Sequence, residues 1–112
     1  MLTIERLKEL GVDTESGLAN CMNNEKFYIK MVEIVIKDSK FDKLDKAIAD
    51  KSLWEAFEAA FALRGITFST GLTPLFEPLD RLLNMLEHEK DADHASIYKP
   101  IKELRDQILR EL

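Results

Sequence analysis

The chain has few of the residues that cross-link or interrupt a fold. Its 112 residues include one cysteine, four glycines and three prolines. A single cysteine, Cys21, cannot form an internal disulfide, which agrees with a reducing compartment, and we expect it to be a small packed thiol. No apolar run approaches the roughly 20 residues that span a bilayer. The N-terminus also lacks the apolar core of a signal peptide, so we expect a cytoplasmic protein without a membrane partner.

The chain also lacks an excess of basic residues. Sixteen lysines and arginines face 21 aspartates and glutamates, which gives a net charge of −5. Residues 37–51 hold the densest lysines, but aspartates are interleaved with them. That alternation is typical of a solvated helix face, whereas nucleic-acid binding requires a basic stripe. We therefore expect no nucleic-acid partner.

Helical spacing of apolar residues dominates the sequence, and no strand-length alternation occurs. Helices are expected to begin at or near Thr3, Asp13 or Thr14, Asn24, Ser39, Ser52, Thr73 and Asp91 or Asp93. Ser52-Leu-Trp-Glu55 fits a capping box, and Thr73-Pro74 fits a cap followed by a first helical residue. Pro78 is expected to disturb one first turn, and Pro100 to kink or divide the last helix.

Short connections between these helices favour antiparallel neighbours. The first helix should end before Gly11, the second near Met22, the fourth near Ala49 and the fifth near Thr70. No repeat or interdomain linker occurs. The sequence thus predicts an all-α fold in one domain, residues 1–112, forming an antiparallel up-down-up-down four-helix bundle with short N-terminal helices.

Residues 60–71, AFALRGITFSTG, contain a spaced motif within the fifth expected helix. Arg64, Gly65 and Gly71 fit the pattern His, two residues, Lys or Arg, Gly, five residues, Gly. This segment resembles the signature of histidine-containing phosphotransfer (HPt) domains of bacterial phosphorelays, which are helical bundles. Phe61 occupies the position of the phosphoryl-accepting histidine. A phenyl ring has no nitrogen lone pair, so Phe61 cannot form a phosphoramidate.

Two rows of side chains are expected on this helix at about 100° per residue. One row is small and apolar and suits close packing in the core. The other is aromatic and comprises Trp54, Phe57, Phe61 and Phe68. The N-terminal helices are expected to cover Trp54 and Phe57. Phe61 is expected to be exposed and to contact a partner, as large apolar patches on soluble proteins do.

Gly65 and Arg64 follow Phe61 by about one turn. Gly65 is unfavourable within a helix by about 1 kcal/mol relative to alanine. The resemblance implies that it leaves room for a receiver domain, while close helix packing is the alternative. Arg64 would pair with the acidic pocket of a receiver domain or, alternatively, be an ordinary surface arginine that contacts Glu58 or solvent. Gly71 is interpreted as a helix stop.

Other candidate chemistry is scarce. His88 and His94 belong to the acidic run EHEKDADH, which is interpreted as a solvated connection between helices. No metal-binding or phosphate-loop spacing occurs, so neither a metal nor another cofactor is expected. Ser69 and Thr70 need no special role.

The resemblance implies a component of bacterial two-component signal transduction that is not an enzyme. The favoured hypothesis is an HPt-like domain that cannot accept a phosphoryl group and binds a response-regulator receiver domain or a histidine kinase through Phe61, Arg64, Gly65 and the aromatic row. An active intermediate that uses another residue is one alternative. A helical interaction or oligomerisation module, in which the aromatic row binds a second copy, is another.

Overall fold

The computed structural model describes all residues, 1–112, as seven α-helices without a strand. The helices are α1 (Ile4–Glu9), α2 (Thr14–Asn20), α3 (Glu25–Ile36), α4 (Lys40–Ala49), α5 (Leu53–Ser69), α6 (Thr73–His88) and α7 (His94–Glu111). The prediction of an all-helical chain is confirmed. None of these helices combines the length and the apolarity needed to cross a membrane.

Four helices begin at side-chain caps that the sequence predicted. Thr3, Asp13, Asn24 and Asp93 each accept a hydrogen bond from the backbone amide three residues later, over 3.0–3.3 Å. Each cap satisfies an amide that has no partner inside the helix, which explains why these polar residues determine the helix starts.

Two predicted helix starts were wrong in detail. The Ser52 side chain makes no capping hydrogen bond, and only its backbone oxygen accepts, from Ala56 N at 2.9 Å. Thr73 is the first residue of α6 rather than its cap, because the cap position belongs to Leu72. The Thr73 hydroxyl instead donates to the Gly71 carbonyl at 3.3 Å.

Neither internal proline divides its helix. Pro78 lies within α6 and Pro100 within α7, and both helices are assigned without a break. A proline removes one backbone hydrogen bond from a helix. The remaining bonds and the buried leucines of α6 hold that helix together, and Tyr98 and Ile101 anchor α7 on both sides of Pro100.

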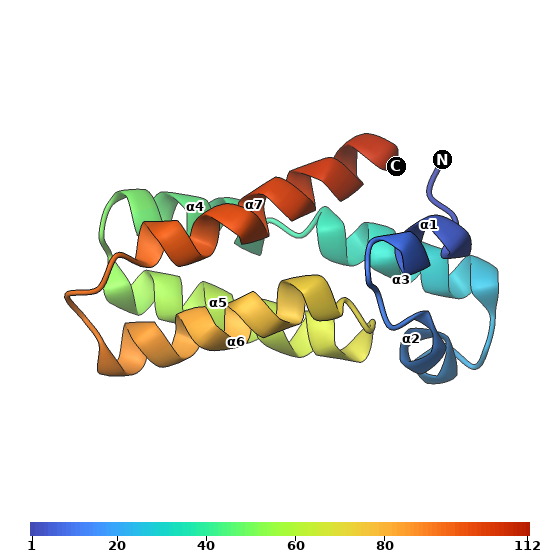
Figure 1. Ribbon diagram of the computed structural model, residues 1–112, viewed down its shortest axis with the longest axis horizontal. Coiled ribbons are helices and arrows are strands. Elements are labelled where there is room, and N and C mark those ends of the chain that lie inside the picture. The colour runs from blue at the N-terminus through green and yellow to red at the C-terminus, as the bar shows by residue number, and fades with distance from the viewer.

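Helices α4 to α7 contain most of the core. Helix α5 packs against α4 and α6, and α7 packs against α6 and α4. Figure 1 shows these four helices side by side along the long axis of the molecule. Their inner faces supply fully buried side chains such as Phe41, Leu44, Leu63, Leu79 and Ile108.

Helices α1 to α3 gather at one end of the molecule, beside the α5–α6 turn (Figure 1). The buried Tyr28 hydroxyl donates to Thr70 O at 2.7 Å, and Asp13 N donates to Gly71 O at 2.8 Å. Cys21 is buried at this end, as predicted. These contacts fasten the N-terminal helices to the C-terminal end of α5 and leave the other end of α5 uncovered.

Candidate functional site

Helix α5 presents two different faces. Its inner face consists of small or medium side chains, and Ala56, Ala60, Leu63 and Thr67 are buried. The Thr67 hydroxyl donates to Leu63 O at 2.8 Å, so its polar atom is satisfied inside the core. Small residues on this face allow neighbouring helices to approach closely.

The outer face of α5 carries large aromatic side chains in solvent. Trp54 is 69% exposed, Phe61 56% and Phe68 68%. The exposure predicted for Phe61 is confirmed. The prediction that the N-terminal helices cover Trp54 was wrong, because those helices sit at the opposite end of α5. The same prediction was wrong for Phe57, which is half-buried beside residues of α6 rather than beneath the N-terminal helices.

We call Trp54, Phe57, Phe61 and Phe68 the α5 aromatic row. Trp54 and Phe57 stack with ring centroids 6.2 Å apart, and Phe57 and Phe61 are separated by the same distance. Phe68 contacts the ring of Phe76 on α6 at 5.2 Å. Stacked pairs prefer offset arrangements in this distance range, so the row is a preformed aromatic surface.

Arg64 lies between the aromatic row and α6. Its guanidinium carbon is 5.4 Å from the centroid of the Phe61 ring, and its Nη1 is 3.0 Å from Asp80 Oδ1. The alternative that Arg64 pairs with Glu58 was wrong, because Glu58 lies on the α4 side of α5, beside the α4 lysines. Exposed ion pairs contribute at most about 1 kcal/mol, so another carboxylate can compete for Arg64.

Gly65 lies on the outer face beyond Phe61. A Cβ built on Gly65 would find no atom within 4 Å. Close packing within the chain therefore does not explain this glycine. Gly71, in contrast, has a φ of 69° immediately after the α5 C-cap, which confirms its prediction as a helix stop.

A depression of about 360 Å³ lies beside Phe57, Phe61 and Arg64. Asp80, Arg81, Leu83, Asn84 and Glu87 of α6 complete its lining. The site therefore joins exposed aromatic surface to charged groups of both signs. Such a surface can recognise a partner, but the Phe61 ring cannot take part in phosphoryl transfer.

The hydroxyl groups near this surface are already engaged. Ser69 Oγ donates to Gly65 O at 3.1 Å, and Thr70 Oγ1 donates to Ile66 O at 2.8 Å. In these contacts both hydroxyls donate to backbone carbonyls and not to a basic side chain, so neither is activated as a nucleophile there.

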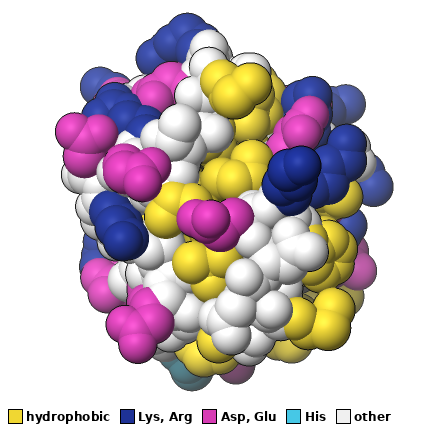
Figure 2. All heavy atoms as spheres, turned by 90° about the vertical axis from the view of Figure 1, so that its right-hand side faces the viewer, with side chains coloured by type: hydrophobic (Ala, Val, Ile, Leu, Met, Phe, Trp, Pro, Cys, Tyr) yellow, Lys and Arg dark blue, Asp and Glu magenta, His cyan; other side chains and the backbone are white.

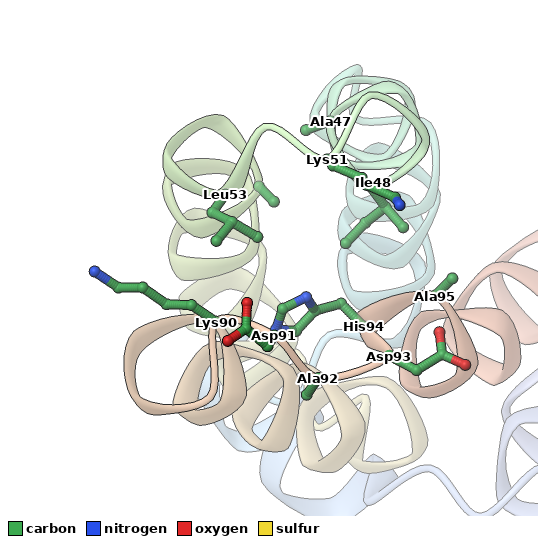
Figure 3. Close-up of a pocket in the computed structure, with 11 residues that line it drawn as sticks. Ala47, Ile48, Lys51, Leu53, Lys90, Asp91, Ala92, Asp93, His94 and Ala95 are labelled. Carbon is green, nitrogen blue, oxygen red and sulfur yellow. The ribbon is translucent and has the colours of Figure 1, made fainter.

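A second cavity, of about 470 Å³, lies at the end of the molecule where the α4–α5 and α6–α7 connections meet. Figure 3 shows the His94 ring pointing into the space below Ile48 and Leu53, toward the connection that carries Asp91, while the Lys90 side chain points away. His94 is only 8% exposed, and its Nε2 lies 2.9 Å from Glu89 O.

The interpretation of both histidines as parts of a solvated connection was therefore wrong for His94. Its ring closes the end of the core and binds a carbonyl near the C-terminus of α6. His88 is exposed and lies 3.7 Å from Glu87. No group of three His, Cys, Asp or Glu side chains is arranged to hold a metal ion.

The end formed by α1 to α3 also exposes apolar side chains. Met22, Phe27 and Ile34 are accessible there. In Figure 2, acidic and basic side chains interrupt the hydrophobic surface of this end. It has no counterpart of the stacked rings on α5.

Comparison with known proteins gave no match of any kind. No family model matches the chain, and neither a curated protein nor a solved structure is significantly similar to it.

Proposed function

We propose that this protein is a divergent HPt-like domain of a bacterial two-component phosphorelay, in which recognition replaces phosphoryl transfer. In this proposal α4 to α7 form an antiparallel up-down-up-down four-helix bundle of the HPt type. The outer face of α5 binds the receiver domain of a response regulator or a histidine kinase. The observation that carries the proposal is the 56% exposure of Phe61, at the motif position of the phosphoryl-accepting histidine.

Contact energy supports recognition at this surface. Transfer of a phenylalanine side chain from water to an apolar interface contributes roughly 1.5–3 kcal/mol. That amount changes affinity by about one to two decades. Trp54 and Phe68, which are also exposed, enlarge the apolar area that a partner could cover.

The surroundings of Phe61 suit a receiver domain. The open space above Gly65 allows close approach of another backbone. Arg64 supplies a guanidinium group for the carboxylates of a receiver pocket. These carboxylates would replace Asp80, whose ion pair with Arg64 is exposed. Binding without transfer would sequester the receiver or compete with an active HPt protein.

Phosphotransfer from a receiver domain tests the proposal. Receiver domains labelled with radioactive phosphate are incubated with the native chain, with Phe61→His and with Phe68→His. Phe61→His regains the complete motif and should acquire acid-labile phosphate, whereas the native chain should remain unlabelled. Phe68→His places a histidine on the same face without Arg and Gly at the motif spacing, so it should also remain unlabelled.

Two results would contradict the proposal. Acid-labile phosphate on the native chain would show that another residue accepts the phosphoryl group, and mass spectrometry of peptides would locate it. Equal labelling of Phe61→His and Phe68→His would show that the motif surroundings of position 61 do not direct docking.

A further inference from the structure

We propose that the chain forms a two-fold symmetric homodimer through the outer face of α5, with the two α5 helices pointing in the same direction. This inference does not depend on the proposed phosphorelay function. Both proposals use the same surface, however, so self-association and receiver binding would exclude each other.

The outer face of α5 lies between a basic edge and an acidic edge. On the α4 side, Lys40, Lys43 and Lys46 border a groove of about 410 Å³. Lys40 pairs with Asp38, whereas Lys43 and Lys46 form no ion pair within the chain. On the α6 side, Asp80, Arg81 and Glu87 border the depression beside Phe61, so this edge carries one more acidic than basic side chain.

The charges closer to the aromatic row have the opposite order. Glu55 and Glu58 lie on the α4 side of the row, between it and the lysines. Arg64, which is also on α5, lies on the α6 side of the row, whereas Arg81 lies on α6 itself beside Asp80 and Glu87. From α4 to α6, the face therefore runs basic, acidic, aromatic, basic and acidic.

Two face-to-face dimers with two-fold symmetry are possible, and they differ in which charged edges meet. If the symmetry axis runs along α5, the α4 edge of one copy meets the α6 edge of the other, and opposite charges face each other at both the inner and the outer positions. If the axis runs across α5, each edge meets its own copy, and like charges face each other. Charge complementarity selects the first arrangement.

The contacts along α5 also fix the register. Lys46 borders the same groove as Glu55 and Glu58, and Glu87 borders the same depression as Phe57. Lys46 and Glu87 thus lie at similar positions along the axis of α5, on opposite sides of that helix. In the selected dimer, Lys46 of each copy faces Glu87 of the other.

Phe61 and Gly65 occupy the centre of this interface. Both lie near the middle of the outer face, and nothing in the chain covers the Gly65 position. Packed helices approach to about 8–10 Å, and small residues favour the shorter distances. The dimer therefore explains an exposed glycine that the monomer leaves without a packing role.

Sedimentation equilibrium of the full chain tests the association. We expect the native chain to dimerise with a dissociation constant in the micromolar range. Phe61→Ser removes two rings from the interface and should weaken the dimer roughly 100-fold or more. Gly65→Gln should also abolish it, while its melting temperature as a monomer stays equal or rises, because Gln is the better helix former.

Charge reversal tests the orientation. Lys46→Glu and Glu87→Lys should each weaken the dimer by about 10-fold, because like charges then face each other twice. An equimolar mixture of the two variants restores both opposite-charge contacts and should associate more tightly than either variant alone. Glu103→Lys, on α7, is the control and should change nothing, since Glu103 lies away from α5.

Three results would overturn the dimer. The first is a native chain that remains monomeric at about 1 mM, where even weak association is detectable. The second is unchanged association of Phe61→Ser or Gly65→Gln. The third is a mixture of the charge variants that associates no more tightly than its components. None of these results bears on receiver binding, which the phosphotransfer assay measures separately.

Discussion

The inner and outer faces of α5 reverse the usual distribution of side-chain size. Ala56 and Ala60 are buried, whereas Trp54 and Phe68 on the same helix are largely exposed. Large apolar side chains stabilise a monomer most when they are buried. The difference indicates that the inner face of α5 maintains the fold and that the outer face is available for recognition.

This separation has an energetic consequence. A buried side chain contributes its transfer free energy to folding, whereas an exposed ring gains that free energy only when a partner covers it. Substitutions on the two faces should therefore affect different measurements.

The largest expected contrast is between Leu63 and Phe61. Leu63→Ala opens a cavity at a fully buried position and should lower the free energy of unfolding by about 2–5 kcal/mol. Phe61→Ala should change it by about 0.5 kcal/mol or less, as surface substitutions usually do. Urea denaturation at low protein concentration measures both values. Similar losses from the two variants would remove the distinction between the faces.

Gly17 and Gly65 form the next contrast. A Cβ at Gly17 would overlap the Tyr28 ring and lie 2.6 Å from Thr70 O. Gly17→Ala should therefore destabilise the chain by about 1–3 kcal/mol, the range for an overpacked core. Gly65→Ala meets no atom and should stabilise it by up to about 1 kcal/mol. A thermal melt that destabilised both variants equally would contradict the open surface at Gly65.

Tyr28 tests the attachment of the N-terminal helices to α5. Loss of its hydrogen bond in Tyr28→Phe should lower the free energy of unfolding by about 1 kcal/mol. Burial raises the pKa of Tyr28 to about 12, above its ordinary value of 10.0. The neutral phenol is thus favoured in the folded state. The stabilisation of the fold by neutral Tyr28 is therefore complete below pH 10 and is lost as pH rises toward 12.

Alkaline titration of the native chain and of Tyr28→Phe separates this effect from the ionisation of other groups. The variant should lose less stability between pH 10 and 12 than the native chain. Identical pH profiles would show that Tyr28 ionises equally easily in the folded and unfolded chains.

The smallest expected effect concerns the exposed caps of α2 and α7. Hydrogen bonds from the Ser16 and Ser96 side chains lower the pKa values of Asp13 and Asp93 below 3.8. The stabilisation of the fold by these two ionised carboxylates is complete well above pH 3.8. It is lost as pH falls through their lowered folded-state pKa values. Asp93→Asn retains a capping oxygen that does not titrate, so acid unfolding of this variant should begin at a slightly lower pH. An unchanged acid midpoint would contradict this prediction.

Local chemistry explains which parts of the fold could be predicted from the sequence. The caps at Thr3, Asp13, Asn24 and Asp93 depend on atoms three residues apart. Thr3 and Asn24 were predicted outright, and Asp13 and Asp93 were each one of two predicted candidates. The stop at Gly71 likewise depends on one backbone angle. Such features need no knowledge of distant neighbours.

The errors concern contacts between segments that are distant in sequence. Trp54 is uncovered because α1 to α3 attach near Thr70, a position set by Tyr28 and Gly17. Arg64 pairs with Asp80 across a helix boundary, which single-helix spacing does not reveal. The buried position of Gly17 could have been suspected from a glycine inside a short helix, but its neighbour Tyr28 could not.

The most direct test of recognition through the outer face of α5 is an NMR titration of the native chain with a receiver domain activated by beryllofluoride, at a protein concentration below that of self-association. The amide shift changes are expected to be largest at Phe61, Gly65 and Phe68. Residues of the buried inner face that do not adjoin these three should show no change. The changes should be lost in Phe61→Ser. Shift changes confined to α3 or α7, or equal changes in the native chain and Phe61→Ser, would contradict recognition through the outer face.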